Sequence, residues 1–326
     1  MAHATNSPAA AALDLSVQRI ALANDVIDPC FRNSPQFEAE SLGKRLGCRL
    51  VVKVETANPI RSFKARGAQF FVSRLQHRIP LVCASAGNFG QGMAYAARQH
   101  GIRLTVFTNN GASAFKVERM RALGAEVRAV GTHPDEALSG AACFATETGA
   151  LLVEDGRDPA ISEGAGTIAM ELSGWPSPFD AVVVPLGDGG LLAGIACWIK
   201  AHSPNTRLIG VCATGAPAMR LAWRHRQVIS APCSTIADAL AVQTPFPEAL
   251  ARLQASTDEI LLVDDAALVQ GMRLAHHELG LVLEPAGAAG LAALLTHSAD
   301  FREQSVATVL TGGNLTAEQM RQWLTR

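Results

Sequence analysis

Short apolar segments alternate with amphipathic segments along nearly the whole chain. The short segments are rich in Val, Ile and Leu, and several are apolar on both faces of the pleat, as buried parallel strands are. These predicted strands cover residues 49–55, 81–86, 103–108, 126–130, 151–154, 181–185, 207–212 and 306–310. Helical periodicity separates them, most clearly over residues 89–99, 114–123, 161–172 and 266–279.

This β-α alternation predicts an α/β fold, in which a parallel sheet carries helices on both faces. Glycine and serine stand at several strand-to-helix junctions, where an open α/β sheet places its ligand site. No solenoid-type repeat and no linker composition interrupts the pattern. We therefore expect two lobes, whose boundary the composition does not mark.

The composition restricts the class of protein. Of the 326 residues, 48% are apolar and 17% are charged, which excludes a disordered chain. Lys and Arg number 28 and Asp and Glu 29, so the net charge is −1. That balance offers no basic surface for nucleic acid or for an anionic membrane. No apolar run approaches the about 18 residues that span a bilayer, so we expect neither partner.

The cysteines and the N-terminal segment indicate a cytoplasmic protein. The seven cysteines are widely spaced and form no CxxC pair, which favours free thiols over disulfides or zinc. The segment MAHATNSPAAAALDL lacks a basic stretch before its alanine cluster. It therefore predicts a loose tail and not a signal peptide.

A lysine at a predicted helix start is the first candidate for chemistry. In NPIRSFKARGA, residues 58–68, Ser62 is suited to cap a helix that continues toward His77, so Lys64 falls in its first turn. The helix macrodipole disfavours a cation there, and we expect a lowered pKa and the neutral amine that a Schiff-base lysine requires. An ordinary surface lysine is the alternative at this point.

The segment SAGNFGQG, residues 85–92, follows a predicted strand directly. The small residues Ser85, Ala86 and Gly87 allow backbone N–H groups to close on an anion at a helix N-terminus. Asn88 adds a side-chain donor for a phenolate or carboxylate oxygen. An ordinary N-capping turn would have the same residues, so both interpretations stay open on this motif alone.

Two further turns follow predicted strands. PLGDGGLLAG, residues 185–194, has the design of a phosphate cradle built from main-chain N–H groups. A dinucleotide fingerprint is excluded, because Leu192 stands at the third glycine position and no acidic residue ends the next strand. No P-loop Lys-Ser/Thr pair is present either. In VLTGGN, residues 309–314, Thr311 offers a hydrogen bond at the sheet's carboxyl edge or simply forms a turn.

Together the four motifs resemble the fold-type II pyridoxal-phosphate enzymes, the tryptophan synthase β-subunit superfamily, and within it the threonine/serine dehydratase branch. The resemblance extends from about Val26 to the C-terminus and includes DPAISEGAGTIAMEL (158–172), TIADALAV (235–242) and EPAGAAGLAAL (284–294). It implies a two-lobed α/β fold, each lobe a mainly parallel twisted sheet flanked by helices. The large cofactor-binding lobe would comprise residues 1–75 and 150–326, and the small mobile lobe residues 76–149. A homodimer is also implied.

The resemblance assigns roles to the motif residues. Lys64 would be the catalytic residue and would hold pyridoxal 5′-phosphate covalently, with Phe63 packed beside the ring. Asn88 would bond the cofactor's 3′-oxygen, and Thr311 would face the pyridine nitrogen. The backbone amides expected to bind the phosphate are those of Gly187, Gly189, Gly190 and Leu191. The residues expected to bind the substrate carboxylate are Ser85, Ala86, Gly87 and Asn88.

The implied activity is that of an ammonia-lyase, or dehydratase, that works by β-elimination. It would convert an L-β-hydroxy-α-amino acid, such as threonine, serine or a phenylserine-like compound, into a 2-oxo acid and ammonia through an aminoacrylate-type enamine. A β-replacement enzyme of the cysteine or cystathionine synthase kind is an alternative, but its Thr-Ser-Gly-Asn-Thr and Gly-Thr-Gly-Gly-Thr motifs are missing. Intact Lys64, Asn88 and Thr311 argue against a non-catalytic cofactor-binding protein. At 326 residues the chain matches a catalytic core, so we expect no amino-acid-sensing domain and no feedback inhibition by isoleucine.

Several positions depart from the pattern of this branch. Asp188 replaces a glycine, and its side chain should point outward or cap its own helix, because an anion beside a phosphate is unfavourable. Ala86 stands where serine racemases carry a second serine, so we expect little racemisation. Cys212 replaces a metal-ligating glutamate, and we expect no divalent metal site, a monovalent ion being left open. Phe89 replaces a histidine near the substrate. The lead-in at 58–61 resembles a subgroup acting on phenylserine or hydroxyectoine-derived substrates.

Overall fold

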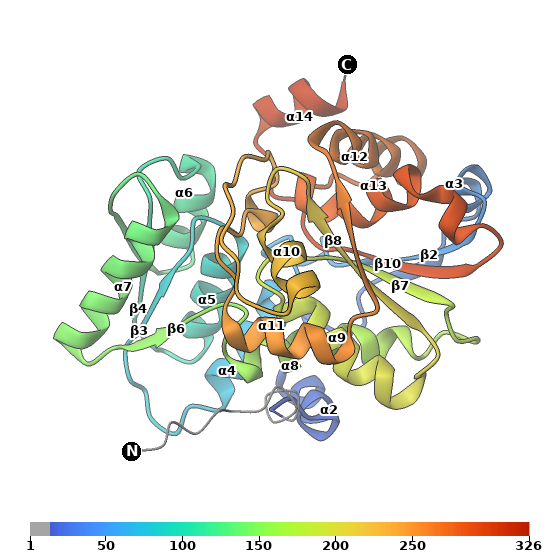
Figure 1. The fold of residues 1–326 in the computed structure, drawn as a ribbon. Helices are drawn as coiled ribbons and strands as arrows, with labels where there is room; N and C mark the ends of the chain where they lie inside the picture. The colour runs from blue at the N-terminus through green and yellow to red at the C-terminus, as the bar shows by residue number, and fades with distance from the viewer. Residues whose placement is uncertain (1–13, 326) are drawn as a thin grey trace.

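Two twisted sheets of unequal size organise the computed structural model, which describes residues 14–325 (Figure 1). The larger sheet has six strands, which in spatial order are β1 (Gln36–Glu38), β2 (Arg49–Val54), β10 (Ser305–Leu310), β7 (Ala181–Pro185), β8 (Arg207–Ala213) and β9 (Glu259–Val263). All its pairings are parallel except that of β1 with β2. The expected N-terminal tail lies outside the described residues over positions 1–13.

The smaller sheet is wholly parallel and lies to one side of the larger one (Figure 1). Its four strands, in spatial order, are β5 (Glu126–Ala129), β4 (Leu104–Thr108), β3 (Leu81–Ala84) and β6 (Leu151–Val153). Strand β6 therefore belongs to the smaller sheet, although the sequence places residues 150–326 in the large lobe. The lobe boundaries and the mobility of the small lobe stay predictions.

Helices cover both faces of each sheet, as the β-α pattern predicts. The first half of the chain contributes α2 (Val17–Val26), α3 (Glu40–Leu46), α4 (Lys64–Ser73), α5 (Asn88–Gln99), α6 (Ala114–Ala122), α7 (Pro134–Thr148) and α8 (Pro159–Leu172). The second half contributes α9 (Gly190–His202), α10 (Ala218–His225), α11 (Pro247–Ser256), α12 (Asp265–Leu279), α13 (Ala289–Thr296) and α14 (Ala317–Leu324). Four short 3-10 turns complete the described chain: η1 (Pro29–Phe31), η2 (Asp238–Leu240), η3 (Pro285–Ala288) and η4 (Ser298–Phe301).

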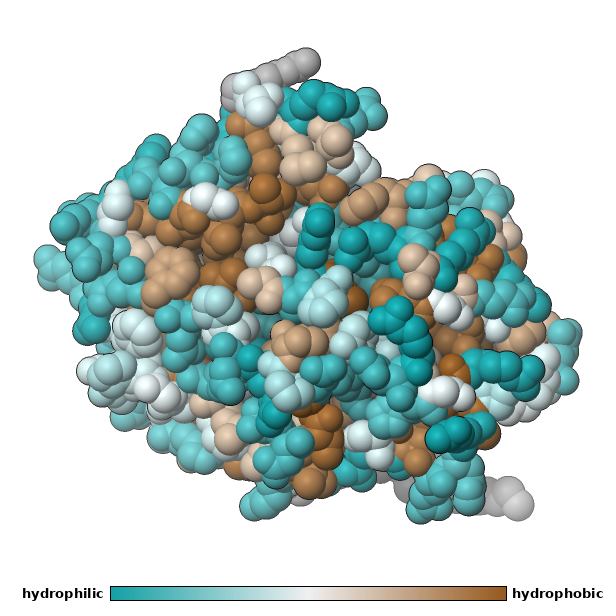
Figure 2. All heavy atoms as spheres, turned by 180° about the vertical axis from the view of Figure 1, so that it is seen from behind, coloured by the Kyte–Doolittle hydropathy of each residue, from teal (hydrophilic) through white to brown (hydrophobic). Residues whose placement is uncertain are grey.

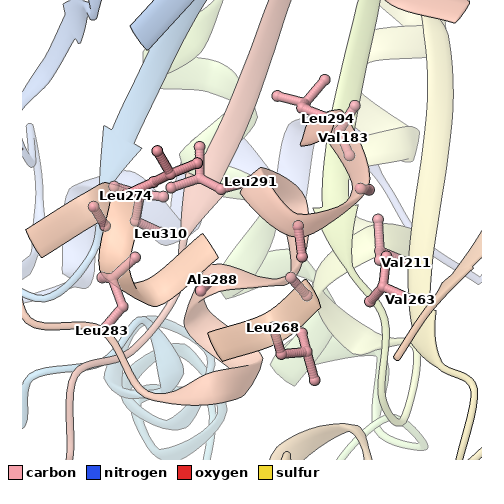
Figure 3. Packing of buried hydrophobic residues seen from close by; sticks show 14 of the residues in the cluster. Val183, Val211, Val263, Leu268, Leu274, Leu283, Ala288, Leu291, Leu294 and Leu310 are labelled. Atoms are coloured by element: carbon pink, nitrogen blue, oxygen red, sulfur yellow. The ribbon is translucent and has the colours of Figure 1, made fainter. Parts of the chain in front are cut away.

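The main hydrophobic core lies between the larger sheet and the helices α12 and α13. Figure 3 shows Val183 and Val211 of neighbouring strands with Leu291 of α13, and all three are buried completely. Each buried aliphatic side chain of this kind stabilises the fold by about 1.5–3 kcal/mol. The opposite face of the sheet packs on α8 and α9, so that both faces are apolar, as parallel sheets require. Seen from behind, the surface is mainly hydrophilic, with an apolar band on the side of the larger sheet (Figure 2).

The predicted strands are confirmed to within two residues at either end, and two strands were missed. Strand β1 has only three residues, which are too few to show a hydrophobic period in the sequence. Strand β9 is an edge strand with the sequence EILLV, which fits a helix segment as well as a strand. The helix expected to run toward His77 ends at Ser73. Among residues 14–325, no helix is long and apolar enough to cross a membrane.

Glycines bring the backbones of four helices into direct contact behind Lys64. A Cβ on Gly67 of α4 would lie 2.4 Å from the carbonyl oxygen of Ile161 in α8. A Cβ on Gly92 of α5 would lie 2.9 Å from the carbonyl of Lys64 itself. A Cβ on Gly194 of α9 would lie 1.9 Å from the carbonyl oxygen of Ser162. This close packing fixes the start of α4 relative to the starts of α5 and α9.

Candidate active site

Two adjoining pockets meet at Lys64, at the carboxyl ends of the strands. The glycine-turn pocket, of about 30 Å³, is lined by Lys64 and by residues of three motifs, including Phe63, Gly187, Gly189, Leu191 and Thr311. The small-sheet pocket, of about 230 Å³, is lined by Lys64, the loop residues Ser85, Ala86, Gly87 and Asn88, and by Phe89, Lys116, Asp155, Asp188 and Asp238. The fold thus gathers the predicted site residues around one lysine. Their individual roles stay predictions.

The first turn of α4 holds Lys64 between the two sheets. Phe63 is the N-cap, one residue later than predicted, and makes no side-chain cap bond, but the hydroxyl of Ser62 accepts the N–H of Lys64 at 3.4 Å. Ser62 also forms a bridge with Gly312, and the N–H of Phe63 donates to the carbonyl of Thr311 at 3.2 Å. These bonds place the end of β10 directly beside the lysine. The threonine is 5% exposed and lines the same pocket as Phe63.

The glycine turn after β7 presents the N-terminus of α9 to the glycine-turn pocket. Gly189, the N-cap, has a φ of +100°, which favours glycine, and it provides no side-chain cap. Leu191 follows in the first turn, where backbone N–H groups have no partner within the helix. The hydroxyl of Ser162 is buried without a hydrogen-bond partner among the described residues, 3.5 Å from where a Cβ on Gly190 would lie. The glycine turn at this pocket, together with Ser162 directly behind it, is therefore rich in hydrogen-bond donors.

Asp188 caps its own helix, which is one of the two placements that the sequence analysis allowed. Its Oδ1 accepts the N–H of Gly190 at 3.0 Å. Its Oδ2 accepts from Lys64 Nζ at 3.0 Å, so the side chain also bridges the lysine and the turn. Gly156, with a φ of +76°, allows the loop after β6 to lie against Asp188, because a Cβ there would meet the Asp188 carbonyl oxygen at 2.7 Å.

That loop brings a second carboxylate, Asp155, to the lysine. Lys64 Nζ donates to Asp155 Oδ2, while Asp155 Oδ1 is buried and has no partner within the described residues. Asp155 was not among the residues predicted from the sequence. It stands in no recognised motif, and only the pairing of β6 with β3 carries it into the pocket. The sequence feature that could have identified Asp155 is its position directly after the strand predicted over residues 151–154.

The two carboxylates change the expected charge of Lys64. Burial acts to lower the pKa of its amine, but the charges of Asp155 and Asp188 outweigh burial and raise that pKa above its ordinary value. The prediction of a lowered pKa is therefore wrong for this arrangement, because it considered only the helix dipole. Burial and the charge of Asp188 raise the pKa of Asp155 to about 7, although Lys64 opposes them. Burial acts to raise the pKa of Asp188, but Lys64 and the Gly190 N–H hold it below its ordinary value.

Asn88 joins the start of α5 to the turn after β10. Its Nδ2 donates to Glu284 Oε1, and its Oδ1 accepts from Asn314 Nδ2 at 2.8 Å. An amide nitrogen has two N–H groups, so Asn88 retains one donor for a ligand. The hydroxyl of Ser85 accepts the N–H groups of Gly87 at 3.2 Å and Gly90 at 2.9 Å. The N-capping role that the motif left open is therefore present here.

Lys116 is a further pocket residue that sequence reasoning missed. It lies in α6, is 8% exposed, and points across to Asp238 Oδ2 of the turn η2 at 3.1 Å. Its Nζ is 3.8 Å from Glu284 Oε2 and 4.0 Å from where a Cβ on Gly87 would lie. Burial raises the pKa of Glu284, opposed by Lys116 and Asn88. A cation thus stands beside the loop expected to bind a carboxylate.

Comparison with known proteins identifies the class. The family model described as "Pyridoxal-phosphate dependent enzyme" matches residues 27–312, and the chain belongs to that family. It is accordingly a pyridoxal-phosphate-dependent protein, and its α/β fold with parallel sheets flanked by helices is the fold-type II architecture that the motifs predicted.

Ammonia-lyases are among its relatives. The chain is 32% identical over 297 residues to an L-threonine ammonia-lyase of Geobacter sulfurreducens, in a match that covers 90% of this chain and 74% of the relative. It is 32% identical over 290 residues to an L-threo-3-hydroxyaspartate ammonia-lyase of a Pseudomonas species, covering 88% and 91%. Among solved structures, the processed form of threonine deaminase isoform 2 from Solanum lycopersicum superimposes with a TM-score of 0.86 at 28% identity, covering 94% of this chain and 88% of that one.

The donor set around Lys64 fits pyridoxal phosphate. The unpartnered Ser162 hydroxyl and the first amides of α9 suit a phosphate at one end of the glycine-turn pocket. Thr311 offers a neutral hydroxyl at the same pocket, and Phe63 offers an apolar ring beside it. Lys64 provides the amine between them. Asp188 already occupies the Gly190 amide, so the fit uses the other amides of the turn.

Proposed function

We propose that this protein is a pyridoxal-phosphate-dependent ammonia-lyase that eliminates water from an L-β-hydroxy-α-amino acid. The products are a 2-oxo acid and ammonia. The observation that carries this proposal is the position of Lys64, whose amine is shared by a donor-rich glycine-turn pocket and by a small-sheet pocket of amino-acid size. The lyase names of the relatives support the same reaction class.

Each motif residue then has a defined task. Lys64 holds the cofactor through its amine, with Phe63 against the ring and Asn88 at the 3′-oxygen. Thr311 bonds the pyridine nitrogen. The phosphate is bound by the turn amides of Gly187, Gly189 and Leu191, while the amide of Gly190, expected to join them, donates to Asp188. The substrate carboxylate is bound by the loop of Ser85, Ala86, Gly87 and Asn88.

The bound cofactor supplies an electron sink that acidifies the substrate's Cα–H bond. The chain supplies the proton transfers and the positioning. Lys64, once its amine is free and neutral, is placed to take the Cα proton. The N-terminus of α5 and the cation of Lys116 orient the carboxylate. Thr311 is neutral and leaves the pyridine nitrogen unprotonated, which favours prompt loss of the β-substituent over long-lived carbanion chemistry.

The charges of the small-sheet pocket favour a substrate whose side chain is neutral. Asp155, Asp188 and Asp238 line this pocket, and its cations are paired with them, since Lys64 contacts the first two and Lys116 the third. A substrate with a β-carboxylate would meet these carboxylates with no cation left to receive it, because Lys116 already orients the α-carboxylate. We therefore favour serine, threonine or a phenylserine-like compound. Ala86, which has no hydroxyl, makes racemisation a minor reaction.

A product assay tests the elimination. Purified protein loaded with pyridoxal phosphate is incubated with L-serine, L-threonine, phenylserine or threo-3-hydroxyaspartate, and the 2-oxo acid and ammonia are measured without an added nucleophile. We expect equal amounts of both products from at least one neutral substrate and the least from hydroxyaspartate. Turnover only of O-acetylserine with a thiol would instead establish the β-replacement alternative. Cofactor binding without turnover of any substrate would indicate a non-catalytic protein.

We also propose a homodimer and a cytoplasmic location. The apolar band on the side of the larger sheet supports self-association, because a second copy of the chain bound there would remove this apolar surface from water (Figure 2). The seven cysteines, all within the described residues, are free thiols, which suits a reducing compartment. Light scattering of the purified protein gives the mass; a monomer at micromolar concentration would refute the dimer.

A further inference from the structure

Two carboxylates contact Lys64, and they are not equivalent. Both oxygens of Asp188 are engaged, one by the Gly190 N–H and the other by Lys64. Asp155 uses only Oδ2 for the lysine, and its buried Oδ1 has no partner among residues 14–325. A carboxyl group with a free oxygen inside the substrate pocket can present a proton to a ligand.

The surroundings of the two groups separate their protonation states. Asp188 lies at a helix N-terminus, which stabilises its anion, and its pKa is held down. Asp155 has no helix N-terminus to help it, and burial beside another carboxylate raises its pKa to about 7. When their surroundings shift the pKa values of two neighbouring carboxyl groups in opposite directions, the group with the lower pKa serves as the anion and the group with the higher pKa serves as the acid.

Resting on the elimination proposed above, we infer that Asp155 is the acid that protonates the departing β-hydroxyl, and that it works with Lys64 as a proton-transfer pair. Both side chains line the small-sheet pocket and touch each other. In a substrate whose Cα proton lies within reach of Lys64 Nζ, Cβ is bonded directly to that Cα and is therefore close to the same nitrogen. The β-substituent is then within reach of a carboxyl that contacts the same nitrogen, as proton transfer requires.

The step balances without an outside reagent. Lys64 takes the proton from Cα, and the electron pair of that C–H bond becomes the Cα–Cβ double bond. The Cβ–O bond breaks, and its electron pair leaves with the oxygen, which takes the proton of Asp155 and departs as water. The Asp155 carboxylate regains its proton from solvent, and the Lys64 ammonium gives its proton to the nitrogen of the departing enamine, so both groups return to their starting states. The enamine is hydrolysed to the 2-oxo acid and ammonia.

The leaving group provides the test. Chloride departs without a proton, whereas hydroxide needs one, so L-serine and β-chloro-L-alanine are compared as substrates of wild type, Asp155→Asn and Asp155→Glu. We expect kcat/KM for L-serine to fall by about 100-fold or more in Asp155→Asn, while the value for β-chloro-L-alanine falls less than about tenfold. Asp155→Glu should recover part of the serine activity. Glu154→Gln is the matched control, since this neighbouring carboxylate is paired with Arg157 and does not contact Lys64.

A second readout does not depend on turnover. In cofactor-free protein at slightly acidic pH, the infrared absorption of protonated carboxyl groups should be smaller in Asp155→Asn than in wild type and unchanged in Glu154→Gln; Glu284, whose pKa burial also raises, contributes to all three. Equal losses on both substrates, unchanged serine activity, or an infrared absorption of protonated carboxyls that does not decrease in Asp155→Asn would each overturn the inference. Wild type that eliminates neither these two substrates nor L-threonine or phenylserine would instead refute the proposed function, and the infrared result would still stand by itself.

Discussion

Arg66 shows how a single buried residue supports the position of Lys64. It stands two residues further along α4, is 0% exposed, and bonds Glu55 through Nε at 2.9 Å and Glu171 through Nη1 at 2.6 Å. Lys53 of β2 joins the cluster through Glu171 Oε2 at 2.5 Å. The cluster ties α4 to a strand and to the end of α8. Removing one partner from a buried ion pair costs about 3–5 kcal/mol, because the other charge is left uncompensated.

Glu171 makes this cluster sensitive to acid. Burial acts to raise its pKa, but Arg66 and Lys53 outweigh burial and hold the pKa below its ordinary value of 4.5. The cluster's contribution to the free energy of unfolding is therefore fully present above that value and is lost as pH falls through the lower, folded-state pKa. We expect Glu171→Gln to lower the free energy of unfolding by about 3 kcal/mol at neutral pH and to weaken its dependence on pH below the ordinary value. Urea titrations at a series of pH values measure both.

A surface pair gives the matched control for that experiment. Glu259 bonds Arg207 at 2.9 Å, and both side chains are about two-fifths exposed. Glu259→Gln should change the free energy of unfolding by less than about 1 kcal/mol. Equal effects of the two substitutions would contradict the role given to the buried cluster.

At the scale of elements, the glycines of the motifs serve helix packing as well as ligand binding. Gly187, Gly189 and Gly190 after β7 are predicted to bind a phosphate, whereas Gly194 of the same motif lies against the backbone of α8. Gly92 and Gly67 likewise permit contact of α5 and α8 with α4. These helices carry the candidate site at their N-termini, so their spacing sets the distance between Lys64 and the two ligand-binding turns.

Gly194→Ala should therefore both destabilise the fold and widen this spacing. The added methyl would meet the Ser162 carbonyl oxygen at 1.9 Å, which is rigid backbone. Overpacking of this kind costs about 1–3 kcal/mol. We expect a lower melting temperature and weaker pyridoxal-phosphate binding, measured by calorimetry and by fluorescence titration. Gly111→Ala, whose methyl would meet only a side-chain atom at 3.6 Å, should change neither, and a melting temperature unchanged in Gly194→Ala would contradict the packing argument.

The periodicity of the chain was enough to predict the elements that position the site, because β2, β3, β7 and β10 are short segments rich in Val, Leu and Ala that are followed by polar turns. Lys64 and the glycine turn were found because they stand in motifs. Asp155 and Lys116 were missed, since each lies in an ordinary-looking segment and only long-range pairing brings it to the pocket. The charge of Lys64 was mispredicted for the same reason: its partners are 91 and 124 residues away in sequence.

At the scale of the whole molecule, the candidate site lies where the two sheets face each other. Lys116 belongs to α6, which packs on the smaller sheet's side, and its partner Asp238 belongs to a turn on the side of the larger sheet. A wide opening of about 750 Å³ next to the site is lined by both sides as well, for example by His133 and Gln243. The contact between Lys116 and Asp238 therefore joins the two halves across the substrate pocket.

Lys116→Met tests this bridge. Loss of the cation beside the loop at Gly87 removes an attraction for the substrate carboxylate and the contact with Asp238. We expect KM for the amino acid to rise about tenfold, which corresponds to about 1.4 kcal/mol, and kcat to change much less. Steady-state kinetics separate the two. Lys200→Met, which removes an ion pair with Asp258 away from the site, should leave both constants unchanged; a fall in kcat alone in Lys116→Met would contradict this role.

The most direct test of the central claim is product formation by Lys64→Ala. The variant and wild type are loaded with pyridoxal phosphate, checked for the same circular dichroism, and assayed for 2-oxo acid released from the best neutral β-hydroxy amino acid. If the pockets that meet at Lys64 are the site of elimination, the rate falls by about 10³-fold or more. A folded Lys64→Ala protein that releases 2-oxo acid at the wild-type rate would contradict the account.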